Sequence, residues 1–227
     1  MFFFHPTYLL VFPGILLMIW AQNRVQGTYQ RYAQIPSTLG MTGEDVARTI
    51  LRRMGVHDVR VEPVRGQLTD HYDPRTRTVR LSQGIFNSRS LAAAAVAAHE
   101  CGHVLQDVQG YSLMNLRSTL VPVAGFGANF GPMLVLAGLF LGSSSVLVPL
   151  GIALFAAAIL FHIVTLPVEF DASSRALRLI DEFGILQGRE HEGAKAVLNA
   201  AAWTYVATAV VAVLQLLQYL LLAQRND

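Results

Sequence analysis

Charged residues are missing from three long stretches of this 227-residue chain. No Asp, Glu, Lys or Arg occurs between Met1 and Asn23, between Ser118 and Val168, or between Ala196 and Gln224. About 20 apolar residues cross the core of a bilayer, and a charge at its centre costs about 3 kcal/mol or more. The three stretches therefore exclude an ordinary soluble chain and predict an integral membrane protein.

Cysteine is nearly absent, basic runs are missing, and a cleavable leader is not expected. The single cysteine, Cys101, excludes an intramolecular disulfide. The net charge is only +2 and no cluster of basic residues is present, so nucleic acid is not an expected partner. The N-terminal apolar stretch has neither a basic n-region nor a small-residue cleavage site, and we expect it to be retained as a span.

The charge-free stretches are long enough for four transmembrane helices. The stretch between Ser118 and Val168 is too long for one span, and Gly142-Ser143-Ser144-Ser145 is a suitable turn between two. The predicted spans lie near Thr7–Ala21, Thr119–Leu141, Val146–Leu166 and Ala202–Leu222.

Two polar segments lie between the spans. Asn23–Arg117 carries 12 of the 17 Lys and Arg residues, and Glu169–Asn199 carries four. An even number of spans separates the two segments, so both lie on the same side of the membrane. The excess of Lys and Arg makes that side the cytoplasm of a multi-pass cell-membrane protein.

The first polar segment mixes helix and strand signals. Thr42-Gly43-Glu44-Asp45 resembles a capping box and predicts a helix to about Met54. A second helix is expected to be capped by Asn87 or Ser88 and to end near Gln109, before Gly110. Between the two helices, apolar and polar residues alternate as in half-buried strands over Asp58–Val64, Gln67–Tyr72 and Thr76–Leu81.

The second polar segment is predicted to be helical. Pro167 is a favoured first-turn residue, so a new helix is expected to begin there, run to Ile180, break at Gly184 and resume near Glu190. The predicted fold is therefore a mainly α membrane protein with a small α+β domain that contains a short antiparallel sheet. The predicted divisions are a first transmembrane helix (1–22), a cytoplasmic region (23–117), a transmembrane hairpin (118–167), a cytoplasmic helical segment (168–200), and a last transmembrane helix with its tail (201–227).

His99-Glu100-Cys101-Gly102-His103 forms an H-E-x-x-H motif. Residues i and i+4 share one face of a helix, so both imidazoles can reach one metal ion. A zinc ion lowers the pKa of its bound water to about 7, and Glu100 is predicted to accept a proton from that water. By residue frequencies alone the motif occurs in roughly one chain in a few hundred of this length, but its Ala-rich helical context favours the functional reading. Cys101 is expected to be a small packing residue.

A catalytic zinc site typically has three protein ligands, and two histidines supply only two. Glu169 is the best candidate for the third, because it is the first charged residue after the predicted third span. Asp171 lies nearby but points about 200° away on a helix. A carboxylate stabilised at a helix N-terminus is the alternative interpretation of Glu169.

Two motifs together resemble the bacterial membrane zinc metallopeptidases of the YugP type. They are Ala98–His103 and Leu166–Ser173, supported by Thr69–Pro74 and Val197–Ala201, and the likeness covers nearly the whole chain. The resemblance implies a gluzincin-type site with one zinc ion and Glu169 as third ligand. A more distant likeness to the membrane peptidases of the prenyl-protein and HtpX types places Ser173 where those proteins carry Asp. Asp171 or Ser173 is then expected to orient an imidazole of the site.

Gluzincins usually pair a strand with the substrate backbone, and Gln67–Tyr72 or Thr76–Leu81 is a candidate for that strand. His71 and Tyr72 are candidate donors to the developing oxyanion, although ordinary hairpin residues are an equally good reading of them. Arg175 is expected to pair with Asp171 at i, i+4.

The predicted function is a zinc-dependent endopeptidase that cleaves protein or peptide substrates, in particular membrane-associated ones, at the cytoplasmic surface. A non-catalytic zinc-binding scaffold or chaperone-like partner is the alternative, and Glu100 argues against it because a closed structural site does not need that carboxylate. An intramembrane protease of the site-2 type would need an Asp ligand in a later apolar helix. Neither the Ser118–Val168 stretch nor the last span contains Asp.

Overall fold

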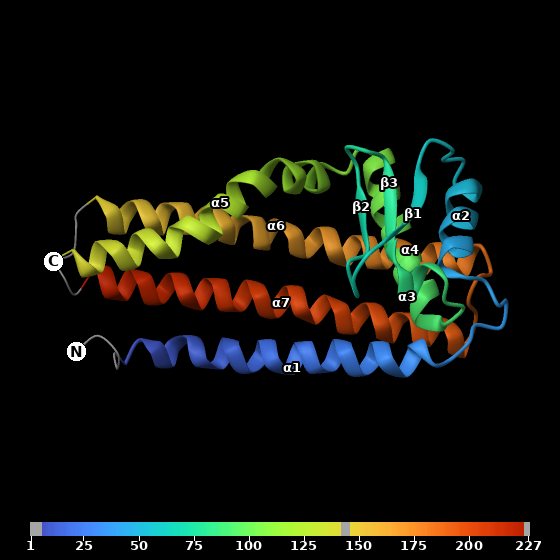
Figure 1. Cartoon of the computed structure of the whole chain (residues 1–227), viewed down its shortest axis with the longest axis horizontal. Helices are drawn as coiled ribbons and strands as arrows, with labels where there is room; N and C mark the ends of the chain where they lie inside the picture. Colours follow the sequence, from blue (N-terminus) through green and yellow to red (C-terminus); the bar gives the residue numbers. More distant parts are fainter. Residues whose placement is uncertain (1–5, 142–145, 225–227) are drawn as a thin grey trace. The chain divides into compact units, whose positions relative to one another are not determined.

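The computed structural model describes residues 6–141 and 146–224. The helices and strands of these residues are shown in Figure 1 and are α1 (Tyr8–Ala33), α2 (Gly43–Arg53), β1 (Arg60–Val64), β2 (His71–Asp73), β3 (Thr78–Ser82), α3 (Gln83–Phe86), α4 (Leu91–Val108), α5 (Ser112–Phe140), α6 (Leu147–Glu182) and α7 (Arg189–Gln224). They form two compact units. Of the described residues, the first unit contains 6–22, 112–141, 146–167 and 204–224, and the second contains Asn23–Tyr111 and Val168–Trp203.

The first unit is built from long apolar helices. Each of α1, α5, α6 and α7 is long and apolar enough to cross a membrane, and each covers one of the four predicted spans to within a residue at the ends of that span. Glycines let α5 and α6 pack closely: a Cβ on Gly127 would lie 2.2 Å from the Leu154 carbonyl oxygen, and one on Gly151 would lie 2.7 Å from that of Gly131. Small residues at such crossings are typical of membrane helix pairs. The turn predicted at residues 142–145 lies outside the described residues.

The prediction that a new helix begins at Pro167 is wrong. Instead of starting a new helix, Pro167 lies inside one continuous helix from Leu147 to Glu182. A proline removes one backbone donor, but helices of membrane proteins tolerate this where other groups satisfy the freed carbonyl. The predicted break at Gly184 is confirmed, because α6 ends at Glu182 and Gly184 has a φ of +63°. Helix α7 then continues without interruption into the last predicted span.

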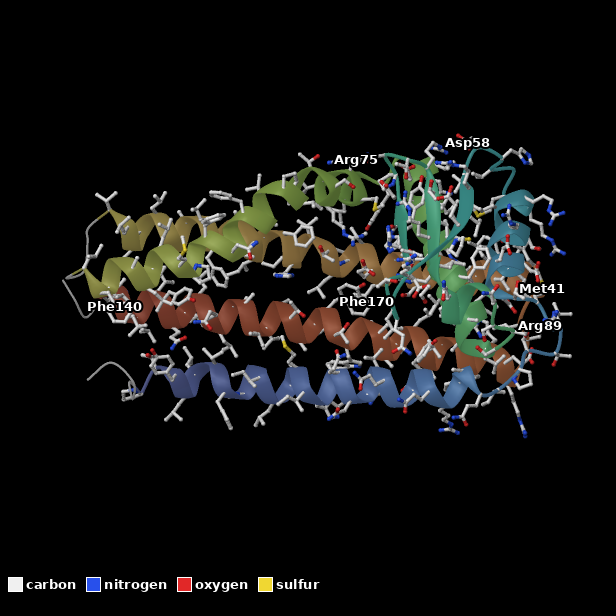
Figure 2. All side chains as sticks on the ribbon, viewed as in Figure 1. Met41, Asp58, Arg75, Arg89, Phe140 and Phe170 are labelled. Carbon is white, nitrogen blue, oxygen red and sulfur yellow. The ribbon has the colours of Figure 1, made fainter. Side chains whose placement is uncertain are left out.

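The second unit begins with α2 as the capping box predicts. The backbone amide of Asp45 donates to Thr42 Oγ1 at 3.1 Å, and that of Thr42 donates to Asp45 Oδ2 at 3.0 Å. Val46, Ile50 and Leu51 are buried on the inner face of α2. Nitrogen and oxygen atoms are frequent on the side chains around the sheet of this unit, as Figure 2 shows.

The sheet is mixed and not purely antiparallel as predicted. Its strand order is β1-β3-β2, with β1 parallel and β2 antiparallel to β3. Alternation along a strand predicts which side chains are buried, but not which strand becomes its neighbour or in which direction it runs. The central strand β3 is buried at Thr78, Val79, Leu81 and Ser82. The strand predicted over Gln67–Tyr72 is confined to His71–Asp73.

Helix α4 lies at the centre of the second unit. Its N-cap is Ser90, whose Oγ accepts from the Ala93 amide at 3.2 Å, and not Asn87 or Ser88 as predicted, because the short helix α3 ends just before those residues. Gly110, with a φ of +65°, follows its C-terminus. Most alanines of α4 are fully buried, so the helix can approach its neighbours closely.

Candidate metal centre

Two histidines of α4 face the same side of the helix. His99 and His103 lie one turn apart, and their ring centroids are 4.8 Å apart in an edge-to-face arrangement. Both rings are largely shielded from solvent, with side chains 15% and 7% exposed. The i, i+4 spacing therefore produces the paired imidazoles that the sequence predicts.

Glu169 of α6 approaches both imidazoles. Its Oε2 lies 3.2 Å from His99 Nε2 and 3.7 Å from His103 Nε2, and its side chain is 2% exposed. The ligand atoms of the three residues all lie within 4.8 Å of one another, close enough to hold one metal ion. Because α6 begins at Leu147, Glu169 is in the middle of a helix, and the alternative interpretation as an N-terminal carboxylate is wrong.

A glycine allows α4 and this part of α6 to come together. A Cβ built on Gly102 would lie 2.4 Å from the carbonyl oxygen of Ala172, closer than real Cβ atoms approach backbone. Gly102 lies between the two histidines of the motif, and Ala172 lies one turn after Glu169. Because Gly102 has no side chain, α4 and α6 can lie close enough for the Glu169 carboxylate to reach the imidazoles.

The outer nitrogens of the two imidazoles also have partners. His99 Nδ1 lies 3.2 Å from Ser173 Oγ, and His103 Nδ1 lies 2.9 Å from Gln106 Oε1. The structure thus brings Ser173 to the site directly. Asp171 does not touch an imidazole in the described contacts, but it accepts a hydrogen bond from Gln106 at 2.8 Å. Gln106 is not among the site residues predicted from the sequence, because its side chain does not ionise. Its position three residues after His103 is the feature that could have indicated its role.

Glu100 is buried beside the cluster and is not one of the three candidate ligands. It is 6% exposed, and burial raises the pKa of its carboxyl group to about 7, against the opposing influence of His99. The backbone amide of Tyr72 donates a hydrogen bond to it. A carboxyl group whose pKa lies near neutrality is well suited to accept and return a proton.

The donor set fits a zinc ion. Two imidazole nitrogens and one carboxylate oxygen form a ligand set found in catalytic zinc sites, which leave one further position for water or substrate. Hydrogen bonds to the outer nitrogens orient the rings, as they do for metal-ligating histidines in general. Cys101 is not part of the cluster: it is fully buried, its Sγ lies 3.7 Å from the Ala47 carbonyl oxygen, and burial raises the pKa of the thiol.

Comparison with known proteins agrees with this geometry. The family described as "Putative neutral zinc metallopeptidase" matches residues 7–224. The chain belongs to this family. A curated relative, "Putative membrane protease YugP" of Bacillus subtilis (strain 168), is 46% identical over 206 residues, which cover 91% of each chain. No solved structure matches.

The two candidate oxyanion donors have other partners in this metallopeptidase. Tyr72 directs its hydroxyl to Asp107 Oδ2 at 2.7 Å, and burial together with this hydrogen bond raises its pKa. His71 is exposed, with Nδ1 2.8 Å from the Thr69 carbonyl oxygen and Nε2 3.4 Å from Arg80. No described contact joins either side chain to the cluster, so only the backbone of β2 is seen to touch the site.

Arg175 pairs with Asp171, as the i, i+4 spacing predicts. The same guanidinium also donates to Gln109 Oε1 and lies 5.6 Å from the centroid of the Tyr111 ring. One oxygen of Asp171, Oδ2, therefore accepts from both the Arg175 guanidinium and the Gln106 amide. Arg77 forms ion pairs with Asp107 of α4 and with Asp58. Asp58 and Arg75 are labelled in Figure 2, on the loops that border the sheet.

Proposed function

We propose that this protein is a membrane-bound zinc endopeptidase that hydrolyses peptide bonds of membrane-associated proteins near the cytoplasmic surface. The observation that carries the proposal is the meeting of His99, His103 and Glu169 around one point, with Glu100 beside them on α4. A zinc scaffold without catalysis would not need a buried carboxyl group that is left out of the ligand set.

The residues of the site have two roles, metal binding and proton transfer. His99, His103 and Glu169 would hold the ion through two Nε2 atoms and one carboxylate oxygen. When bound, zinc supplies Lewis-acid polarisation of the peptide carbonyl and acidifies the attacking water. Glu100 would accept a proton from the attacking water, whose oxygen bonds to the peptide carbonyl carbon, and would return that proton to the amine nitrogen as the C–N bond breaks.

Metal removal tests the peptidase activity. The purified protein is expected to cleave members of a peptide library at internal bonds, to lose this activity on treatment with 1,10-phenanthroline, and to regain it when zinc is added. Mass spectrometry of the products identifies the cleaved bonds. Stoichiometric zinc without any cleavage would favour the scaffold, and cleavage that persists after removal of the metal would exclude the proposed chemistry.

The proposed cytoplasmic location of the site is based on the excess of Lys and Arg in the two polar segments. Because Cys101 is buried, single cysteines can report this topology. A cysteine at the exposed Gln67 is expected to react with a membrane-impermeant maleimide only after the cells are permeabilised, whereas one at the exposed Leu141 reacts in intact cells. The reverse labelling pattern would place the site outside the cytoplasm.

A further inference from the structure

Gln106 connects three parts of the metal site. It lies on α4 and is fully buried. Its Oε1 is 2.9 Å from His103 Nδ1, and its Nε2 is 2.8 Å from both the Val168 carbonyl oxygen and Asp171 Oδ2. A glutamine amide has two N–H donors and one carbonyl oxygen, so every hydrogen-bonding end of this side chain has a partner.

The partners of the amide nitrogen determine the orientation of the amide. A backbone carbonyl can only accept, and the Asp171 carboxylate, which is paired with Arg175, also accepts. Both N–H groups of Gln106 are therefore used on those two oxygens. Only the amide oxygen remains to face His103, and since this oxygen cannot donate, His103 Nδ1 must carry the hydrogen.

We propose that Gln106 is a positioning residue that fixes the tautomer of His103 and thereby prepares its Nε2 to bind the metal. A neutral imidazole carries one N–H, so a hydrogen on Nδ1 leaves the lone pair on Nε2. That nitrogen is the one that lies 3.7 Å from Glu169 Oε2. The inference rests on the proposed function only in assuming that the cluster binds zinc.

The partner of His99 Nδ1, unlike that of His103 Nδ1, does not fix the tautomer of its imidazole. The partner of His99 Nδ1 is the Ser173 hydroxyl, which can either donate or accept, so it is compatible with both tautomers. Gln106 also donates to the carbonyl of Val168, the residue directly before Glu169. One side chain on α4 thus orients a histidine ligand and aligns the segment of α6 that carries the third ligand.

The tautomer can be measured without catalysis. In metal-free protein labelled with ¹⁵N in its histidine rings, long-range ¹H–¹⁵N spectra distinguish a protonated from an unprotonated ring nitrogen, and the His103 signals are assigned by their loss in His103→Gln. We expect His103 to be protonated at Nδ1 and unprotonated at Nε2. A neutral His103 protonated at Nε2 would overturn the inference.

Two substitutions separate positioning from packing. Gln106→Leu removes the acceptor, so the metal-free His103 is expected to move its hydrogen to Nε2, where Glu169 can accept it, and zinc affinity is expected to fall by about 10–100-fold. Gln106→Glu keeps an acceptor for Nδ1 and should retain the wild-type tautomer, with a smaller loss of affinity. Gln83→Leu, the same change at an exposed glutamine, should leave both properties unchanged.

The outcomes distinguish this inference from the proposed function. Equal zinc affinity of Gln106→Leu and Gln83→Leu, with helix content by circular dichroism equal to wild type, would overturn it. If Gln106→Leu does not fold, the wild-type spectrum and the tautomer in Gln106→Glu still decide. A protein that shows the expected tautomer and zinc affinities but cleaves no peptide would refute the peptidase proposal alone.

Discussion

Replacing Glu100 by glutamine is expected to reduce peptide hydrolysis by about 10²–10⁴-fold while zinc content stays at the wild-type level. Glutamine has nearly the same shape but cannot accept a proton from water at neutral pH. Glu100 is buried next to the three candidate ligands without belonging to them, so the metal site itself should remain. The loss should appear in kcat, because the proton transfer belongs to the chemical step.

The measurement compares initial cleavage rates with zinc content in the same preparations. Glu192→Gln is a matched control, because it makes the same change at an exposed position on α7. The control should retain both activity and zinc. Cleavage by Glu100→Gln at the wild-type rate would refute the role of Glu100 as general base, whereas loss of both zinc and activity would make it a structural residue of the site.

Replacing Glu169 by glutamine is expected to weaken zinc binding by more than about 100-fold, beyond the usual effect of changing a partner of a metal ligand. Glutamine offers a neutral amide oxygen in place of the carboxylate that lies 3.2 Å from His99 Nε2 and 3.7 Å from His103 Nε2. The substitution removes the negative charge that balances the positive charge of the zinc ion. This loss matters because the site has little access to water. Activity should fall in parallel with zinc occupancy.

Competition with a chelator of known affinity measures this change. Glu182→Gln places the same substitution at an exposed position of the same helix, and it should bind zinc like the wild type. Unchanged zinc affinity in Glu169→Gln would show that the third ligand lies elsewhere in the chain.

Local patterns predicted the parts of the fold that depend on local chemistry. The absence of charge predicted the four long apolar helices, and the capping signal at Thr42 predicted α2. The i, i+4 histidines lie on a helix as their spacing requires. Each of these features is decided by neighbours within a few residues in the sequence, which is why periodicity and composition could reveal it.

Features that depend on tertiary packing were missed. Pro167 suggested a helix start, but its neighbours in α6 continue the helix through it. Gln106 carries no charge and no motif, and its importance appears only when Val168 and Asp171 pack against it. Likewise, Gly102 could be recognised as a small residue, but not as the contact point with the backbone of Ala172.

The central claim is that His99, His103 and Glu169 together hold one zinc ion, and X-ray absorption at the zinc edge of the purified protein tests it most directly. We predict two imidazole nitrogens with Zn–N of about 2.0–2.1 Å, the remaining ligands being oxygen. The spectrum should lose one imidazole in His103→Gln. A sulfur ligand at about 2.3 Å, which only Cys101 or a methionine could supply, or a single imidazole in the wild type, would contradict the claim.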